Sequence, residues 1–161
     1  MPITNAAVSI PFTTKRPDPL ACPVIGKDPD QAELGSVVYC QVCMVCHGDV
    51  GQGLDEWRKE LQPPDDNCFQ SGCHGKKHPP EGFIIPNSSP PVIGKGILDK
   101  YGNALSLHDY LEEEMPWWRP GYLKAEEYWQ LTAFMLKANG IDPGSDPLDE
   151  KNAAKIKTNS E

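Results

Sequence analysis

The chain contains little that would suit a membrane, a nucleic acid or a β-sheet. No apolar run approaches the roughly 20 residues that a transmembrane helix needs, and no segment of useful length shows a strand pattern. Fifteen basic residues against 23 acidic ones give a net charge of −8. Nucleic acids and anionic membranes are bound by basic surfaces. These absences argue against a nucleic-acid-binding, membrane-surface or membrane-spanning role.

Glycine and proline are abundant, at 14 and 17 of 161 residues, so much of the chain is expected to form loops. Between these loops the sequence carries helix signals. Asp30 and Glu33 form a capping box that should begin a helix running toward Cys46 and ending near Gly48. Other helices are predicted over residues 55–61, 107–114 with Ser106 as N-cap, and 125–139 with Gly140 beyond its end. The predicted fold class is all-α.

Six cysteines concentrate the chemistry of this chain. The first cluster is Cys43-Met44-Val45-Cys46-His47. A C-x-x-C-H run is the attachment signature of c-type haem. Two thiols about one helical turn apart can add to the two haem vinyl groups as thioethers. His47 can then bind the iron through an imidazole nitrogen.

The second cluster is a longer-spaced variant of the first. It runs from Cys68 through four residues to Cys73-His74. Gly72 gives this wider loop the backbone freedom to bring both sulfurs to one porphyrin. Both clusters end in Cys-His-Gly. The pair therefore predicts two covalently bound haem c groups, with His47 and His74 as proximal ligands.

A structural zinc site is the alternative interpretation of the same cysteines. Cys43, Cys46, Cys68 and Cys73 could form a tetrahedral four-cysteine site. A zinc site would leave the histidine after both second cysteines unexplained. A zinc ribbon would also bring β-hairpins, which the sequence does not indicate. The haem interpretation is favoured.

From about Gly35 to Leu136 the sequence resembles the class I c-type cytochromes. The resemblance implies a cytochrome c domain over residues 30–140, with a haem-binding insertion at 54–89. From the sequence itself, the repeated prolines of residues 1–29 predict an extended N-terminal arm, and the polar, aperiodic residues 141–161 predict a solvated C-terminal tail. The segments that carry the resemblance are Gly35-x-x-x-Tyr39-x-x-x-Cys43-x-x-Cys46-His47-Gly48, Pro90-Pro91-Val92-Ile93-Gly94, the Met115-Pro116 loop and the last helix, 127–136.

The resemblance also implies contacts. A proline carbonyl of the segment 90–94 would accept a hydrogen bond from the His47 ring. The first and last helices would cross where Gly35 admits the ring of Tyr128 or Trp129.

Met115 is expected to be the distal ligand of haem 1, since it lies after a short helix and before a Pro-Gly turn. Met44 lies inside the attachment loop and cannot reach across the ring, and Met135 is assigned to the core. For haem 2 the distal candidates are His108 and His78. A ligand from outside the chain and an open site are further alternatives.

Cys22 and Cys40 remain outside both clusters, and we expect them to form a disulfide between the arm and the first helix. Covalent haem attachment in this family implies an extracytoplasmic location, in the periplasm or on the outer face of the cytoplasmic membrane. That compartment suits a disulfide.

The expected function is electron transfer between extracytoplasmic redox proteins, with no catalytic residues of its own. Two alternatives remain open. One is a haem enzyme that acts on a small substrate at an open haem-2 site. The other is a cytochrome subunit of a larger, multi-subunit or membrane-associated oxidoreductase complex.

Overall fold

The structure is a computed structural model that describes residues 18, 20–63, 66, 68 and 72–159. These residues contain no strand, and the only β-pairing among them is an isolated bridge between Asn103 and Lys157. The predicted all-α fold class is confirmed. The helices are α1 (Gln31–Val38), a π-helical turn (Tyr39–Cys43), α2 (Met44–His47), α3 (Leu54–Arg58), a 3-10 turn (Asp99–Tyr101), α4 (Ala104–Glu114), α5 (Ala125–Ala138) and α6 (Glu150–Ala153).

The first helical segment begins and ends where the sequence predicts. The Asp30 carboxylate accepts from the Glu33 backbone N–H at 2.7 Å, and the Glu33 carboxylate accepts from the Asp30 N–H at 2.8 Å. The segment ends at Gly48, whose φ of +84° is unfavourable for a residue with a side chain. The π-helical turn was not predicted. It ends at Cys43, directly before Met44. Such π-helical turns often occur at functional sites.

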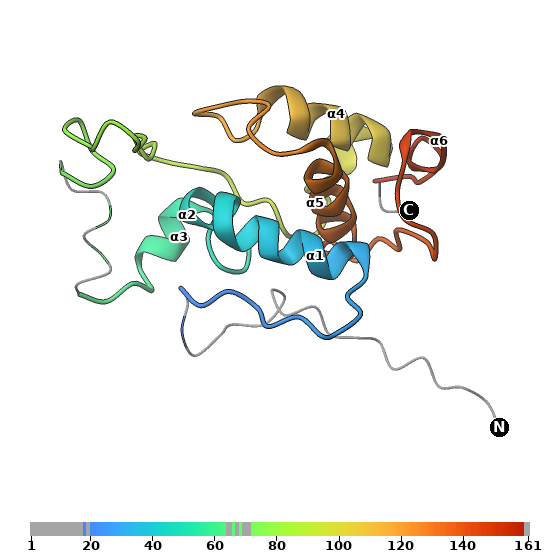
Figure 1. Cartoon of the computed structure of the whole chain (residues 1–161), viewed down its shortest axis with the longest axis horizontal. Coiled ribbons are helices and arrows are strands. Elements are labelled where there is room, and N and C mark those ends of the chain that lie inside the picture. Colours follow the sequence, from blue (N-terminus) through green and yellow to red (C-terminus); the bar gives the residue numbers. More distant parts are fainter. Residues whose placement is uncertain (1–17, 19, 64–65, 67, 69–71, 160–161) are drawn as a thin grey trace.

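Helix α1 crosses α5, as Figure 1 shows. Gly35 lies at the crossing, where an added Cβ would collide with the Gln130 carbonyl and approach the Phe134 Cβ to 2.8 Å. The closest approach to Gly35 is thus the backbone of α5 at Gln130. The expected contact of Gly35 with the ring of Tyr128 or Trp129 stays a prediction.

Helix α4 begins three residues earlier than predicted. Asn103, not Ser106, is the N-cap, because the Asn103 side chain accepts from the Ser106 N–H at 2.9 Å. Ser106 is therefore the third residue of the helix. The helix ends at Glu114, with Met115 as its C-cap directly before Pro116, in agreement with the stop signal in the sequence.

The C-terminal stretch 141–159 is not the solvated tail that its polar composition predicts. It forms α6, capped by Asp149, and buries Leu148, Ala153 and Thr158 to 3%, 0% and 1% exposure. The Ile156 carbonyl accepts from the Ala104 N–H at 2.9 Å. The few apolar residues here are irregularly spaced, so they carry no periodic signal.

A disulfide joins Cys22 to Cys40, with 5.5 Å between the two Cα atoms. The predicted pairing is confirmed, and it ties the described part of the N-terminal arm to the first helical segment. Residues 20–29 of the arm form no helix or strand, and residues 1–17 and 19 lie outside the described residues. Among the described residues, no helix is long and apolar enough to cross a membrane.

Candidate cofactor sites

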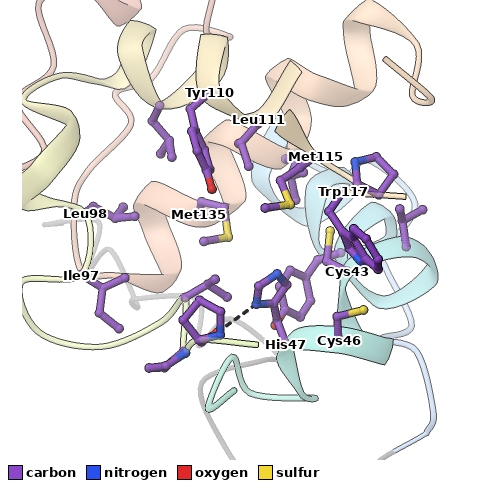
Figure 2. Close-up of a pocket in the computed structure, with 18 of the residues that line it drawn as sticks. Cys43, Cys46, His47, Ile97, Leu98, Tyr110, Leu111, Met115, Trp117 and Met135 are labelled. Atoms are coloured by element: carbon purple, nitrogen blue, oxygen red, sulfur yellow. Dashed lines mark hydrogen bonds between the residues drawn. The ribbon is translucent and has the colours of Figure 1, made fainter. Parts of the chain in front are cut away.

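A cavity of about 120 Å³ that opens to solvent lies between the first helical segment, α4, α5 and the segment 90–101. Cys43, Cys46 and His47 line it from the first helical segment, and Met115 lines it from the loop after α4 (Figure 2). Most of the other lining side chains are apolar. The structure thus brings the two thiols and the histidine of the first motif, together with the predicted Met115 ligand, to one cavity.

His47 is held in one orientation by a backbone group. Its Nδ1 lies 2.9 Å from the Pro90 carbonyl oxygen (Figure 2), so Nδ1 carries the proton and donates. Nε2 is then the basic nitrogen, with a lone pair available to a metal. Burial lowers the pKa of His47, and the bond to Pro90 opposes that shift only in part. The imidazole is therefore neutral at pH 7, the form that binds iron.

Cys43 and Cys46 are outside any disulfide. Burial and the neighbouring Cys46 raise the pKa of Cys43 to about 12. Burial also raises the pKa of Cys46 to about 11, against a hydrogen bond from the Trp117 indole N–H. Both side chains are therefore protonated thiols at pH 7 and lie at the wall of the cavity.

Two methionines, not one, line the cavity. Met115 is half-buried, and its carbonyl accepts from the Tyr128 hydroxyl at 2.8 Å, which holds the loop against α5. Met135 is 5% exposed, so its predicted place in the core is confirmed, but it also lines the cavity. Met44 is buried and is not among the lining residues.

Three polar residues that the sequence did not indicate also line this cavity, namely Lys100, Tyr101 and Tyr110. Lys100 lies with its Nζ 5.0 Å from the ring centre of Tyr101 and 5.7 Å from that of Tyr110. Burial is the main cause that raises the pKa of both phenols, so they remain protonated donors. Figure 2 shows the Tyr110 hydroxyl pointing into the cavity, on the side away from Cys46. The three residues belong to two elements, and nothing in their spacing marks them as a group.

The second motif repeats the orientation of the first histidine. Nδ1 of His74 lies 3.0 Å from the Phe83 carbonyl oxygen, which leaves Nε2 as the basic nitrogen. The His74 backbone N–H donates to the Cys68 carbonyl at 3.1 Å, and the His74 carbonyl accepts from Ile85 at 3.0 Å. Cys68 is half-buried, Cys73 is exposed, and neither is in a disulfide.

The two other histidines lie in different surroundings. His78 is in the same loop as His74, with its Nδ1 2.7 Å from the Pro79 carbonyl oxygen. His108 is 6% exposed on α4 and stacks on Trp129 at 3.6 Å. The first half of α4 and the segment that carries the second motif lie at opposite ends of the molecule (Figure 1). The structure therefore does not bring His108 to His74.

Within the described residues, no group of three or more His, Cys, Asp or Glu side chains is placed to share a metal ion. The four cysteines of the two motifs thus do not form the tetrahedral site of the zinc alternative. The donors present are instead separate sets of two cysteines and a histidine.

No protein-family model matches the chain, and no curated protein matches it. One solved structure with a detectable likeness is the sulfane dehydrogenase SoxCD from Paracoccus pantotrophus. The sequence identity is 23% and the TM-score is 0.45, over 78% of this chain and 52% of the other. The chain thus spans about half the length of the matched chain. A likeness of this extent carries no argument about function.

Proposed function

We propose that this chain is a diheme c-type cytochrome that carries electrons between redox proteins. The observation that carries the proposal is the arrangement around His47. Its Nδ1 is bound to the Pro90 carbonyl, and its cavity is also lined by the Cys43 and Cys46 thiols and by Met115. A thiol pair, an oriented imidazole and a thioether around one apolar cavity are the donor set of a haem with His/Met ligation.

Each residue at the first site has a distinct role in this proposal. Cys43 and Cys46 hold the porphyrin as thioethers, and His47 binds the iron. The haem itself supplies the one-electron chemistry. Met115 provides a neutral ligand that favours ferrous iron and raises the potential. The apolar walls exclude water and strengthen that preference.

The polar residues of the cavity support the same assignment. Haem carries two carboxylates, and these need cationic or hydrogen-bonding partners when they are partly buried. Lys100 provides a positive charge, and the phenols of Tyr101 and Tyr110 provide donors, in a cavity that is otherwise mostly apolar. An apolar metabolite would not require such a group.

The second haem is assigned to Cys68, Cys73 and His74. The support is the bond from His74 to the Phe83 carbonyl, which reproduces the His47–Pro90 arrangement on an unrelated piece of backbone. We assign no distal ligand from α4, because His108 is packed against Trp129. The sixth position of haem 2 then belongs to His78, to a ligand from outside the chain, or to no protein group.

Electron transfer also needs a surface on which a partner can dock. Ile84 and Trp117 are large apolar residues that are 45% and 49% exposed. Trp117 lines the mouth of the first cavity. Exposed aromatics beside a redox centre suit a contact with a redox partner, in solution or within a larger oxidoreductase complex.

The test begins with the chain produced in a bacterial host that attaches haem to exported proteins. A pyridine haemochrome assay and intact mass are expected to give two covalent haems per chain. His47→Ala and His74→Ala should each convert one of the two haems to a high-spin form and leave the other unchanged. A colourless protein, or one that holds zinc, would refute the proposal.

Carbon monoxide distinguishes the electron carrier from the haem enzyme. Added to the reduced protein, it should leave haem 1 unchanged, because Met115 and His47 would both be ligands of its iron and leave no position free. Binding at haem 2 would indicate an open or labile sixth position and would favour the enzyme alternative. A complex that survives size-exclusion chromatography would favour a role as a subunit of a larger oxidoreductase.

A further inference from the structure

The loop after Met115 contacts the second motif through two stacked aromatic rings. Phe83 and Trp118 lie with ring centres 4.6 Å apart and planes only 4° from parallel. They are 35 residues apart in the chain, one in the segment after the second motif and the other in the loop after α4. Packing of two parallel rings adds stability beyond that of the apolar area it buries. The stack therefore joins two segments that are distant in the chain.

Phe83 is bound to His74 in two ways. Its carbonyl oxygen lies 3.0 Å from Nδ1 of His74, and its ring centre lies 4.7 Å from that of the imidazole. The same residue thus fixes the tautomer of His74 and covers its ring. A displacement of Phe83 would move the proposed ligand of haem 2.

Trp118 belongs to the first site. It lines the cavity together with Met115, only three residues before it in the chain. A tight turn holds this loop, since the Arg119 N–H donates to the Pro116 carbonyl at 2.8 Å. The ring spacings of 4.6 and 4.7 Å add to an upper limit of about 9.3 Å between the Trp118 ring centre and the His74 ring centre.

We propose that the Phe83–Trp118 stack connects the two haem sites and fixes their relative position. It rests on the proposed diheme function and adds to it a route for electrons inside the chain. The stack fixes the second haem loop against the methionine loop, so it would set the spacing of the two haem sites across which an electron would be transferred. Phe83 and Trp118 are positioning residues in this scheme, since neither is a ligand.

The second loop has an anchor besides the stack. Ile85 is 5% exposed in the core, and Arg58 donates to the Asn87 carbonyl at 3.1 Å. Removing the stacked ring should therefore loosen the spacing of the two sites without unfolding the loop. The stack can therefore be removed by substitution while Ile85 and Arg58 still hold the loop.

The test is Trp118→Leu in the haem-loaded full chain, with Trp118→Phe as the conservative variant. Tyr122→Leu is the matched control, because the Tyr122 ring touches Trp118 at 5.0 Å but is not a member of the pair that leads to His74. Less than one electron per chain is delivered photochemically, and the redistribution between the haems is followed by their difference spectra. Electron paramagnetic resonance of the oxidised protein reports the magnetic interaction of the two irons.

We expect Trp118→Leu to slow the redistribution at least tenfold and to weaken the magnetic interaction, with two haems still attached. Trp118→Phe should restore most of the rate, and Tyr122→Leu should keep it. Phe83→Leu breaks the stack from the other side and should match Trp118→Leu, which guards against one poorly folded variant. Unchanged rates and spectra in both leucine variants would overturn the inference while leaving the diheme function intact. A single haem in the wild-type chain would refute both.

Discussion

The imidazole of His47 and the carbonyl of Pro90 are 43 residues apart in sequence and 2.9 Å apart in space. That bond makes Nδ1 the protonated nitrogen and leaves Nε2 as the basic one. A loop that contains α3 and the whole second motif lies between the two residues. The geometry of the first site therefore depends on how this long insertion folds back to bring Pro90 beside His47.

Replacing Met115 should change the potential of haem 1 more than any other substitution in the cavity. Met115→Leu removes the neutral sulfur ligand, and the potential is expected to fall by on the order of 0.1 V. The measurement is an optical redox titration, with the thioether-to-iron absorption as a second signal. Met135→Leu is the matched control, since Met135 also lines the cavity. It should cost under about 1.5 kcal/mol of stability and leave the potential in place. A fall in potential in Met135→Leu, with no change in Met115→Leu, would identify Met135 as the ligand.

The disulfide should contribute stability and no redox function. Cys22→Ser opens a cross-link between residues 18 apart in sequence, which the chain-entropy model values at about 3 kcal/mol. Urea unfolding followed by circular dichroism measures this loss. Val24→Ser, at a 96% exposed site in the same arm, should change nothing. Altered haem potentials in Cys22→Ser would contradict a purely structural role.

The crossing of α1 and α5 should not tolerate a methyl group. Gly35→Ala places a Cβ against the Gln130 carbonyl and the Phe134 side chain, and we expect a loss of about 1–3 kcal/mol from overpacking. Thermal unfolding of the haem-loaded protein gives the difference. Gly26→Ala is the control, because nothing lies within 4 Å of an added Cβ there. Equal stability of the two variants would show that the helices can separate at no cost.

Asp30 should make the stability depend on pH in the acid range. Burial raises its pKa, but hydrogen bonds from Lys137 and the Glu33 N–H, together with the Lys137 charge, outweigh burial and hold the pKa below 3.8. As the pH falls, the unfolded chain therefore binds the proton first. The contribution of Asp30 is complete above pH 3.8 and is lost as the pH falls through the lower pKa of the folded state.

Asp30→Ala should accordingly cost about 1 kcal/mol at pH 7, mostly from the lost N-cap. The difference in unfolding free energy between Asp30→Ala and the wild type should narrow below pH 4. Lys137→Met removes only the partly exposed ion pair at 2.9 Å, so it should cost less. Urea titrations at several pH values provide both comparisons. A gap that widens toward low pH would mean that the sign of the shift is wrong.

Local sequence signals predicted the helix ends correctly where a capping side chain or a glycine directly determines the end. The Asp30–Glu33 capping box, Gly48 and Gly140 have direct hydrogen-bonding or conformational causes, and the structure has each in the predicted place. The prediction was wrong where two caps competed, since Asn103 precedes Ser106 and takes the same role. It was also wrong for the tail, where the buried contacts of Leu148 and Ala153 are long-range.

By itself, the sequence determined the donor types and their local spacing: two thiol pairs, each followed by a histidine, in a helical, loop-rich chain. Covalent order along the backbone is sufficient for that. Only the tertiary structure decided which carbonyls orient His47 and His74, that Met135 faces the cavity beside Met115, and that Trp118 meets Phe83. Those contacts join distant segments, and they depend on how the helices pack and how the insertion closes.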